Sequence, residues 1–264
     1  MVRPLITLMT DFGLKDPYVA EMKAVILRTC PEATIVDVSH EVDKFNIRMG
    51  AFILATAAPY FPVGTVHVAI VDPRVGTERR GICIETDRAC YVGPDNGILV
   101  LAAQTQRIRH VYEIKSKKLM MPEVSNTFHG RDVFASAAGH LANGLSPSSF
   151  GPEIVKFVVP KFAGAVKRKG AIAGEVIHVD DFGNIITNIC CGELQSIGVG
   201  RSVRARLKKG EVKMSFCKAY GEVEAGKPLA LIGSHGFLEI SINRGNAASV
   251  FRIKDGDAVT ICRS

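Results

Sequence analysis

Residues 5–13 read LITLMTDFG, a mostly apolar run that ends at a carboxylate and a glycine. The apolar run predicts a buried strand over residues 5–9. Asp16 and Pro17 follow, and they are typical of a helix that begins with an N-cap and a proline at its first position. Apolar residues then recur at helical spacing as far as residue 29. A strand followed by a helix is the first unit of an α/β domain.

The alternation of strand and helix continues to about residue 145. Short apolar runs predict further strands, and longer periodic stretches predict helices. The predicted strands cover residues 34–38, 66–71, 82–85, 90–92 and 111–114, and the predicted helices cover residues 47–58, 97–103 and 132–141. Strands that alternate with helices are typical of a parallel sheet covered on both faces. We therefore expect an α/β N-terminal domain with a mostly parallel sheet covered by helices.

The sequence changes character near residue 160. A stretch rich in glycine, alanine and lysine at residues 161–170 predicts a linker. Beyond it, short alternating runs predict strands at residues 175–179, 185–189, 203–207, 228–232, 237–242 and 258–262. Such short strands are typical of a small barrel or sandwich. We expect an α/β domain over residues 1–160, a linker over 161–170, and a smaller all-β, barrel-like C-terminal domain over 171–264.

Composition excludes several classes of protein. The chain has 264 residues, of which 47% are hydrophobic and 22% charged, and this is ordinary globular usage rather than that of a disordered or collagen-like chain. No apolar run of about 18 residues predicts a membrane span, and residues 1–5 do not resemble a signal peptide. The seven cysteines include no CxxC pair. This favours reduced thiols and a cytoplasmic protein.

The net charge of +7 is unevenly distributed along the chain. Most of the excess lies beyond residue 165 and includes the cluster Lys167-Arg168-Lys169. Small basic barrels can bind RNA, but stacking on unpaired bases needs aromatic side chains, which are few in this region. The charge therefore favours a solvated surface, and nucleic acid is not an expected partner.

Polar residues follow four of the predicted strands. The strands are followed by Asp11, by His40-Glu41, by Asp72 and by Asp95-Asn96. The carboxyl ends of parallel strands meet at one edge of a sheet, where ligands bind. Because Asp and Asn also cap helices and form turns, one such residue alone would be weak evidence. Four together predict an active site at this edge.

Common catalytic and nucleotide-binding motifs are missing from the sequence. It has no GxGxxG after the first strand, no P-loop lysine, no GxSxG and no HExxH. Asp11 suits a pair of ribose hydroxyls, since an ionised carboxylate accepts two hydrogen bonds. The rival interpretation is a metal site at Asp11, His40, Asp72 and Asp95, because acidic strand ends also build two-metal hydrolases.

Five motifs resemble those of one known family. They are Thr10-Asp11-Phe12-Gly13; Val71-Asp72-Pro73 with Val75-Gly76-Thr77 and Arg79-Arg80; Gly93-Pro94-Asp95-Asn96-Gly97; Phe128-His129-Gly130-Arg131-Asp132; and Asp180 with Phe182-Gly183-Asn184. The chain resembles the S-adenosyl-L-methionine (SAM) hydrolases that form adenosine, also called SAM hydroxide adenosyltransferases. These are relatives of the SAM-dependent fluorinase and chlorinase. The resemblance covers nearly the whole chain and both predicted domains.

The resemblance implies a homotrimer in which SAM lies between the N-terminal domain of one subunit and the C-terminal domain of its neighbour. The implied catalytic residues are Asp72, Arg79 and His129. The implied substrate-binding residues are Asp11 for the ribose hydroxyls, Phe45 near the ribose, Asp180 for the amino group, Phe182 and Asn184 for the purine, and Ser234 and His235 near the methionine carboxylate, together with Asn96 and Gly130.

Two positions favour hydrolysis over halide chemistry. Asp72 stands where the halogenating relatives have an aromatic residue, and Gly130 stands where the fluorinase has a serine. Two other positions depart from the family pattern. Arg74 falls where glycine is usual, and His235 replaces an arginine of the halogenases.

The implied reaction is hydrolysis of SAM to adenosine and L-methionine by in-line attack of activated water or hydroxide at C5′. A sulfonium leaves without a proton, so no general acid is needed, and we expect neither a metal nor another cofactor. Free water has a pKa of about 15.7, which makes the nucleophile the difficult part. Arg79 and His129 are expected to stabilise developing hydroxide while Asp72 orients them, and either Asp72 or His129 is a candidate to take the proton. The alternatives are a metal-dependent nucleoside or phosphoester hydrolase and a non-catalytic module that binds SAM or RNA.

Overall fold

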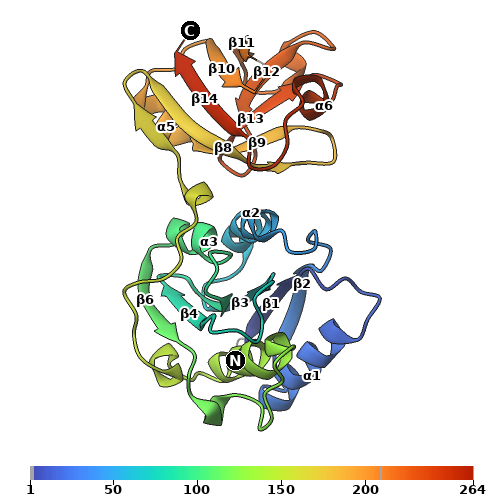
Figure 1. The fold of residues 1–264 in the computed structure, drawn as a ribbon, viewed down its shortest axis with the longest axis vertical. Coiled ribbons are helices and arrows are strands. Elements are labelled where there is room, and N and C mark those ends of the chain that lie inside the picture. Colours follow the sequence, from blue (N-terminus) through green and yellow to red (C-terminus); the bar gives the residue numbers. More distant parts are fainter. Residues whose placement is uncertain (1–2, 209, 264) are drawn as a thin grey trace. The chain divides into compact units, whose positions relative to one another are not determined.

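A computed structural model describes residues 3–208 and 210–263 of the chain. The described residues form two compact units, which meet in the sequence between Pro160 and Lys161 (Figure 1). Each unit has a hydrophobic core of its own. The outer ends of the two predicted domains, residues 1 and 264, lie outside the described residues.

The first unit is built on a six-stranded sheet with the strand order β2-β1-β3-β5-β4-β6. Its strands are β1 (Leu5–Thr10), β2 (Thr34–Ser39), β3 (Thr65–Ile70), β4 (Gly81–Thr86), β5 (Ala89–Pro94) and β6 (Ile108–Glu113). β1 pairs in parallel with β2 and β3, and β3 pairs in parallel with β5. The other two pairings in the described sheet, β4–β5 and β4–β6, are antiparallel.

The expectation of a mostly parallel sheet is therefore wrong, because the sheet is mixed. The reason lies in the connection between β4 and β5, which consists only of Asp87 and Arg88. Two residues can form a hairpin turn, whereas a parallel connection needs a crossover of about a dozen residues. The apolar runs predicted both strands, but an apolar run carries no information about strand direction. The α/β character of the first unit is confirmed.

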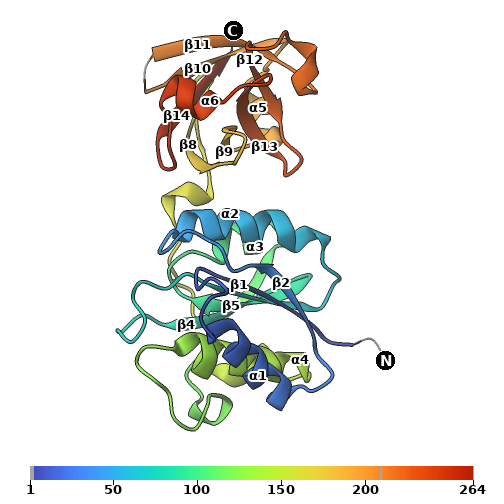
Figure 2. The ribbon, with the colours of Figure 1, turned by 90° about the vertical axis from the view of Figure 1, so that its right-hand side faces the viewer.

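Helices cover both faces of this sheet. α1 (Tyr18–Thr29) and α4 (Ser136–Ala142) lie on one face, and α2 (Ile47–Ala57) and α3 (Val100–Thr105) lie on the other (Figure 2). β1 and β3 are buried along almost their whole length because both of their faces are covered. The predicted alanine-rich helix begins as a π-helical turn, Gly130–Ala135. Such turns are frequent at functional sites.

The second unit is a closed barrel. Its strands are β7 (Val166–Arg168), β8 (Ala171–Val179), β9 (Ile185–Cys190), β10 (Ser202–Leu207), β11 (Gly210–Phe216), β12 (Pro228–Ile232), β13 (Phe237–Ile242) and β14 (Ala258–Arg263). The order β14-β10-β11-β12-β13-β9-β8 forms a ring, which the pairing of β14 with β8 closes. β7 lies outside the ring, paired with β8. The predicted barrel-like fold is confirmed.

Two barrel strands and two short helices escaped prediction. β7 lies within the predicted linker and is exposed along its length, and β11 is mostly exposed. A strand with little burial lacks the alternating apolar pattern by which strands are recognised. The helices α5 (Cys191–Ser196) and α6 (Ala247–Phe251) are too short to show helical periodicity.

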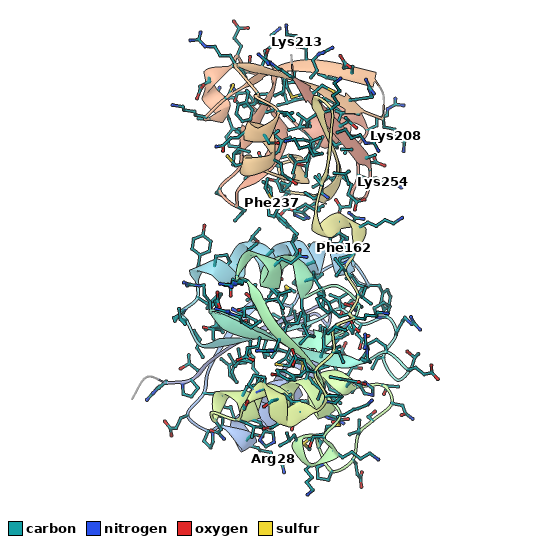
Figure 3. The ribbon with its side chains drawn as sticks, turned by 90° about the vertical axis from the view of Figure 1, so that its left-hand side faces the viewer. Arg28, Phe162, Lys208, Lys213, Phe237 and Lys254 are labelled. Atoms are coloured by element: carbon teal, nitrogen blue, oxygen red, sulfur yellow. The ribbon has the colours of Figure 1, made fainter. Side chains whose placement is uncertain are left out.

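The barrel has an apolar interior and a basic outer surface. Ile172 and Ile185 are fully buried, whereas Lys208, Lys213 and Lys254 are exposed and project outward (Figure 3). Much of the positive charge of this unit is therefore carried by solvated side chains. No helix in the described part of the chain is both long enough and apolar enough to cross a membrane.

Candidate active site

The parallel strands bring four predicted polar positions to one edge of the first unit's sheet. β1, β2, β3 and β5 run in the same direction, so their carboxyl ends lie at the same edge. Asp11, His40, Asp72 and Asp95 follow these ends. The contacts of the four residues divide them into two groups. Asp72 joins a polar cluster and Asp11 organises a loop beside it, whereas His40 and Asp95 hold the fold.

Asp72, Arg79 and His129 form one connected cluster. Nε of Arg79 donates to Asp72 Oδ1 at 3.1 Å, and Nη2 donates to Asp72 Oδ2. The same Nη2 lies 3.1 Å from His129 Nδ1. Only 6% of the Asp72 side chain and 4% of the Arg79 side chain are exposed. The guanidinium carbon of Arg79 also lies 5.3 Å from the centre of the Phe134 ring. The Asp72–Arg79 pair is therefore buried and held by packing, while His129 is half-buried.

The surroundings of His129 keep its imidazole neutral. Burial lowers the pKa of His129 below its ordinary value, the positive charge of Arg79 lowers it further, and Asp72 and Asp132 oppose both effects. Arginine has no hydrogen-bond acceptor and keeps its charge. Nδ1 of His129 therefore accepts from Arg79, and the single proton of the neutral ring lies on Nε2. His129 thus offers an N–H donor at the nitrogen that Arg79 does not occupy.

Two loops hold this cluster together. One loop, residues 71–80, follows β3 and carries the carboxylate and the guanidinium, and the other, residues 122–129, carries the imidazole. The loops meet at Gly76, where a Cβ atom would lie 2.1 Å from the carbonyl oxygen of Asn126. Gly76 also has a φ of 76°, which favours glycine. No other residue type fits this contact without separating the loops.

Asp11 organises the loop that follows β2. Asp11 is only 6% exposed, and its Oδ2 accepts a hydrogen bond of 2.9 Å from the backbone N–H of Phe45. Lys44 donates to the backbone carbonyl of Asp11. Phe45 has a φ of 66°, which is unfavourable for an aromatic residue, and 68% of it is exposed. Backbone strain of this kind clusters at binding sites.

Asn96 supports the strand end that leads to Asp72. Its Nδ2 donates to the carbonyl of Val71 at 2.7 Å, and its Oδ1 accepts from the backbone N–H of Ile98 at 3.2 Å. Both ends of the amide are therefore engaged within the first unit. The contacts give Asn96 a role in holding the loop.

Gly130 is buried against aromatic rings. A Cβ atom on Gly130 would lie 3.2 Å from the Phe128 ring and 3.4 Å from the Phe12 ring. These two rings also pack edge to face, with their centres 5.8 Å apart. A larger side chain at this position would therefore have to displace one of them.

His40 and Asp95 hold the fold. His40 is 4% exposed, with Nδ1 at 2.8 Å from Thr10 Oγ1 and Nε2 at 3.1 Å from Asp37 Oδ1. Asp95 forms an ion pair with Arg80. Among the described residues, no group of three or more His, Cys, Asp and Glu side chains is arranged to hold a metal ion. The four polar strand ends therefore do not converge on one point.

The barrel unit carries a second group of predicted site residues. Asp180, Phe182 and Asn184 line an open cavity of about 590 Å³. Asp180 Oδ1 accepts from the backbone N–H groups of Phe182 at 3.0 Å and Asn184 at 2.8 Å, and Oδ2 accepts from Asn184 Nδ2 at 2.9 Å. One carboxylate thus shapes the whole turn. It presents the Phe182 ring, 80% exposed, beside a fixed amide.

Several residues that line this cavity were not predicted from the sequence. They are Tyr220, Ile242, Arg244 and Gly245. Tyr220 lies on a single 3₁₀ turn, and Arg244 follows β13 with a φ of 55°. Neither belongs to a motif used above, and the pairing of β13 with β9 and β12 brings them beside Asp180. The polar stretch at residues 243–246, which follows a predicted strand, could have indicated Arg244 and Gly245 as site residues.

Ser234 and His235 lie on the turn between β12 and β13. Both are exposed, and Ser234 Oγ lies 3.5 Å from His235 Nδ1. They are not part of the lining of the 590 Å³ cavity. The structure therefore does not group them with Asp180, Phe182 and Asn184.

The fold and its two polar groups define a class of protein with an Asp–Arg–His cluster in an α/β unit and an aromatic-lined cavity in a β-barrel unit. Residues 6–151 match the SAM hydroxide adenosyltransferase N-terminal domain, and residues 174–260 match the C-terminal domain of the same family. The chain belongs to the SAM hydroxide adenosyltransferase family.

Named relatives cover nearly the whole chain. The (R)-S-adenosyl-L-methionine hydrolase of Methanocaldococcus jannaschii is 40% identical, over 97% of this chain and 95% of its own. The protein of the same name from Thermus thermophilus is 38% identical, over 98% of this chain and 100% of its own. A fluorinase from Actinopolyspora mzabensis is 28% identical, over 99% of this chain and 98% of its own. The crystal structure of an uncharacterized conserved protein from Thermotoga maritima matches with a TM-score of 0.88 and 40% identity. The match covers 98% of this chain and 100% of that protein's chain.

Proposed function

We propose that this chain hydrolyses SAM to adenosine and L-methionine. The observation that carries the proposal is the connected Asp72–Arg79–His129 cluster, in which a permanent cation and a neutral imidazole act as fixed donors. Two relatives are named (R)-S-adenosyl-L-methionine hydrolase, and we propose the same sulfonium epimer as the substrate here.

A water molecule held by this cluster is the proposed nucleophile. Its oxygen forms a bond to C5′ of SAM in line with the C5′–S bond, which breaks with its electron pair going to sulfur. Methionine leaves as a neutral thioether and needs no proton. The barrier lies in the nucleophile, because free water has a pKa of about 15.7. The guanidinium of Arg79 and the Nε2–H of His129 stabilise the developing hydroxide, and their burial strengthens both interactions.

Asp72 is the proposed acceptor of the proton lost by the attacking water. Nδ1 of His129 is occupied by Arg79, so the imidazole acts as a donor in this arrangement and not as a base. Arg79 donates one hydrogen bond to each oxygen of Asp72. Because a carboxylate oxygen has two lone pairs, Asp72 can still accept a hydrogen bond from water.

Both units contribute to the proposed substrate contacts. The exposed rings support this assignment, since Phe45 and Phe182 lack the burial that aromatic side chains usually have. We assign Asp11 to the ribose hydroxyls, Phe45 to the sugar, Asn96 and Gly130 to the walls around C5′, Phe182 and Asn184 to the purine, Asp180 to the amino group, and Ser234 and His235 to the methionine carboxylate.

The proposed assembly is a homotrimer in which each site is completed by a neighbouring subunit. The residues assigned to one substrate lie in two separately compact units, one ending at Pro160 and the other beginning at Lys161. The barrel unit of one chain then supplies the purine contacts for the Asp72 cluster of the next. We propose that the reaction uses no cofactor. The free thiols of the cysteines favour a cytoplasmic location.

The proposal is tested by incubating the purified protein separately with the (R) and (S) epimers of SAM. Chromatography should show equal amounts of adenosine and methionine, formed faster from the (R) epimer. A chelator should leave the rate unchanged, and added chloride or fluoride should give no halogenated nucleoside. Binding of SAM without release of adenosine would contradict the proposal. Loss of activity in the chelator would instead support a metal-dependent hydrolase.

A further inference from the structure

A buried carboxylate lies behind the cavity of the barrel unit. Glu239 is on β13 and is 7% exposed. Its Oε1 accepts two hydrogen bonds of 2.7 Å, one from the hydroxyl of Tyr220 and one from the hydroxyl of Ser241. A carboxylate costs free energy to bury unless donors satisfy it. The two hydroxyl donors supply this compensation and connect the carboxylate to two other parts of the barrel unit.

Tyr220 is the donor that connects Glu239 to the cavity. Its ring lines the 590 Å³ cavity together with Asp180, Phe182 and Asn184, and the residue is 43% exposed. Burial raises the pKa of the Tyr220 hydroxyl, and the hydrogen bond and negative charge of Glu239 and the charge of Asp180 raise it further. The hydroxyl therefore stays protonated and remains a donor. A side chain on a short 3₁₀ turn is thereby tied to a strand of the barrel.

The same carboxylate lies against a second element of the unit. A Cβ atom on Gly233 would lie 2.9 Å from Glu239 Oε2, so the backbone at residue 233 passes directly over this oxygen. Gly233 begins the turn that carries Ser234 and His235. Glu239 therefore contacts both the aromatic wall of the cavity and the start of a loop assigned to the substrate.

We propose that Glu239 is a positioning residue, which holds the Tyr220 ring in place as a wall of the nucleoside cavity and so sets the affinity for the adenosine part of the substrate. This inference rests on the proposed function. Orienting the ring before binding removes part of the entropy cost of ordering it on binding. The two hydroxyl donors to Glu239 and the backbone beside its Oε2 all belong to the barrel unit, so we assign the effect to binding and not to the chemical step.

The test compares four single variants and one double variant of the full-length chain. Calorimetry measures the Kd for adenosine, and the SAM assay measures kcat and KM. Glu239→Leu and Tyr220→Phe should each raise the Kd and the KM about three- to tenfold with kcat nearly unchanged, the loss expected for one hydrogen bond. The double variant should be no worse than Glu239→Leu alone, because both changes break the same contact. Glu239→Gln keeps an acceptor for the Tyr220 hydroxyl and should retain affinity close to that of the original chain.

Ser241→Ala is the matched control, because it removes the other hydroxyl donor to Glu239 without touching the cavity wall. It should leave the Kd within about twofold. Additive effects in the double variant, an equal loss in Ser241→Ala, or a fall in kcat at constant KM would overturn the proposal. If Glu239→Leu does not fold, Tyr220→Phe alone decides, because an unchanged Kd in that variant contradicts the role given to the hydroxyl.

The two readouts separate this inference from the proposed function. A chain that binds adenosine with the expected variant pattern, but releases none from SAM, overturns the hydrolase assignment and leaves Glu239 as proposed. A chain that hydrolyses SAM, with Kd and KM unaffected by Glu239→Leu and Tyr220→Phe, overturns the inference alone.

Discussion

Arg79 connects the other two members of the proposed catalytic cluster. Its planar guanidinium contacts both oxygens of Asp72, and Nη2 also reaches Nδ1 of His129. Lysine offers a single charged nitrogen and cannot reproduce this arrangement. The guanidinium therefore decides which imidazole nitrogen holds the proton. That choice makes His129 a hydrogen-bond donor toward a bound water.

Replacing Asp72 by alanine should remove most turnover and leave the affinity for SAM largely intact. Without Asp72, Arg79 loses its orientation and the attacking water loses its proton acceptor. We expect kcat to fall about 10²-fold or more, as on removal of other charge-stabilising groups. The measurement is adenosine release, with calorimetry for binding. Unchanged adenosine release would rule out the assigned role.

Asp95→Ala is the matched control for this substitution. It removes an equally buried carboxylate, 3% exposed, from an ion pair with Arg80 at the same edge of the sheet. Asp72→Ala leaves the buried Arg79 charge unpaired, which costs about 3–5 kcal/mol, whereas Arg80 is 34% exposed and can be solvated. Both variants should therefore melt at a lower temperature, the Asp95 variant by less. Only the Asp72 variant should lose kcat once the folded fraction is taken into account.

The rate should fall on the acid side of neutrality. The pKa of His129 lies below 6.5, so the ring is neutral at pH 7. Lowering the pH through that reduced pKa protonates Nδ1, which sets two cations side by side and detaches Arg79. We expect kcat to be level from about pH 7 upward and to decline only below pH 6.5. In His129→Asn, whose amide oxygen can accept from Arg79, this decline should disappear. An acid limb above pH 6.5 would contradict the neutral ring.

At the scale of elements, the contact between two loops sets the geometry of the cluster. The loop at residues 71–80 and the loop at residues 122–129 touch at Gly76, with no space for a side chain. The loops belong to segments far apart in the sequence, and each carries part of the cluster. Their separation by even a small distance would therefore move Arg79 away from His129.

Gly76→Ala should lower kcat about 10²-fold, which is the effect of misplacing a reacting group by roughly 1 Å. The added Cβ would lie 2.1 Å from the carbonyl oxygen of Asn126, so one loop must shift. Gly64→Ala is the control, because Gly64 has a φ of 88° but no atom within 4 Å of the added Cβ. Both substitutions carry the backbone cost of about 1–2 kcal/mol and should lower the melting temperature. A similar kcat in the two variants would count against the loop contact.

Buried elements were predictable from the sequence, and their directions were not. The run at residues 66–71 corresponds closely to β3, because burial on both faces leaves a continuous apolar signature. The run at residues 34–38 also corresponds to β2, an edge strand that is only partly buried but keeps three β-branched apolar residues. The mixed sheet was missed because the direction of β4 depends on a two-residue connection. The exposed strands β7 and β11 were missed because they bury too little to show a pattern.

The candidate site was predictable where its residues follow strands or lie in motifs. Asp72 and Asp95 look alike in the sequence, since each follows a buried strand. Their different roles come from Arg79 and Arg80, and only the folded loops decide which guanidinium meets which carboxylate. Tyr220 carries no local signal at all, because its place in the cavity depends on the pairing of β12 with β13 and of β13 with β9.

At the scale of the whole molecule, the two groups of site residues allow a test of the proposed assembly. A chain carrying Asp72→Ala is defective in its first unit, and a chain carrying Phe182→Ala with Asn184→Ala is defective in its barrel. Each should be nearly inactive by itself. Trimers co-expressed from equal amounts of both should regain about a quarter of full activity, because one in four neighbouring pairs joins two intact halves.

The measurement is adenosine release from the co-expressed complex, with sedimentation to establish its size. Separately purified variants, mixed without subunit exchange, are the control and should remain inactive. Absence of recovery in a complex that does contain both chains would mean that each site is built within one subunit.

The closure of the barrel between β8 and β14 has a consequence for how the protein is made. These are the first and last ring strands along the chain, so the ring cannot close before β14 has left the ribosome. The first unit is complete at Pro160 and can fold while the barrel is still being translated. Until closure, β8 and β10 each present an open edge that can pair with another nascent chain. A chain that is truncated before Ala258 would therefore have a folded first unit and an open barrel with two unpaired edges. We expect such a chain to aggregate and not simply to be less stable.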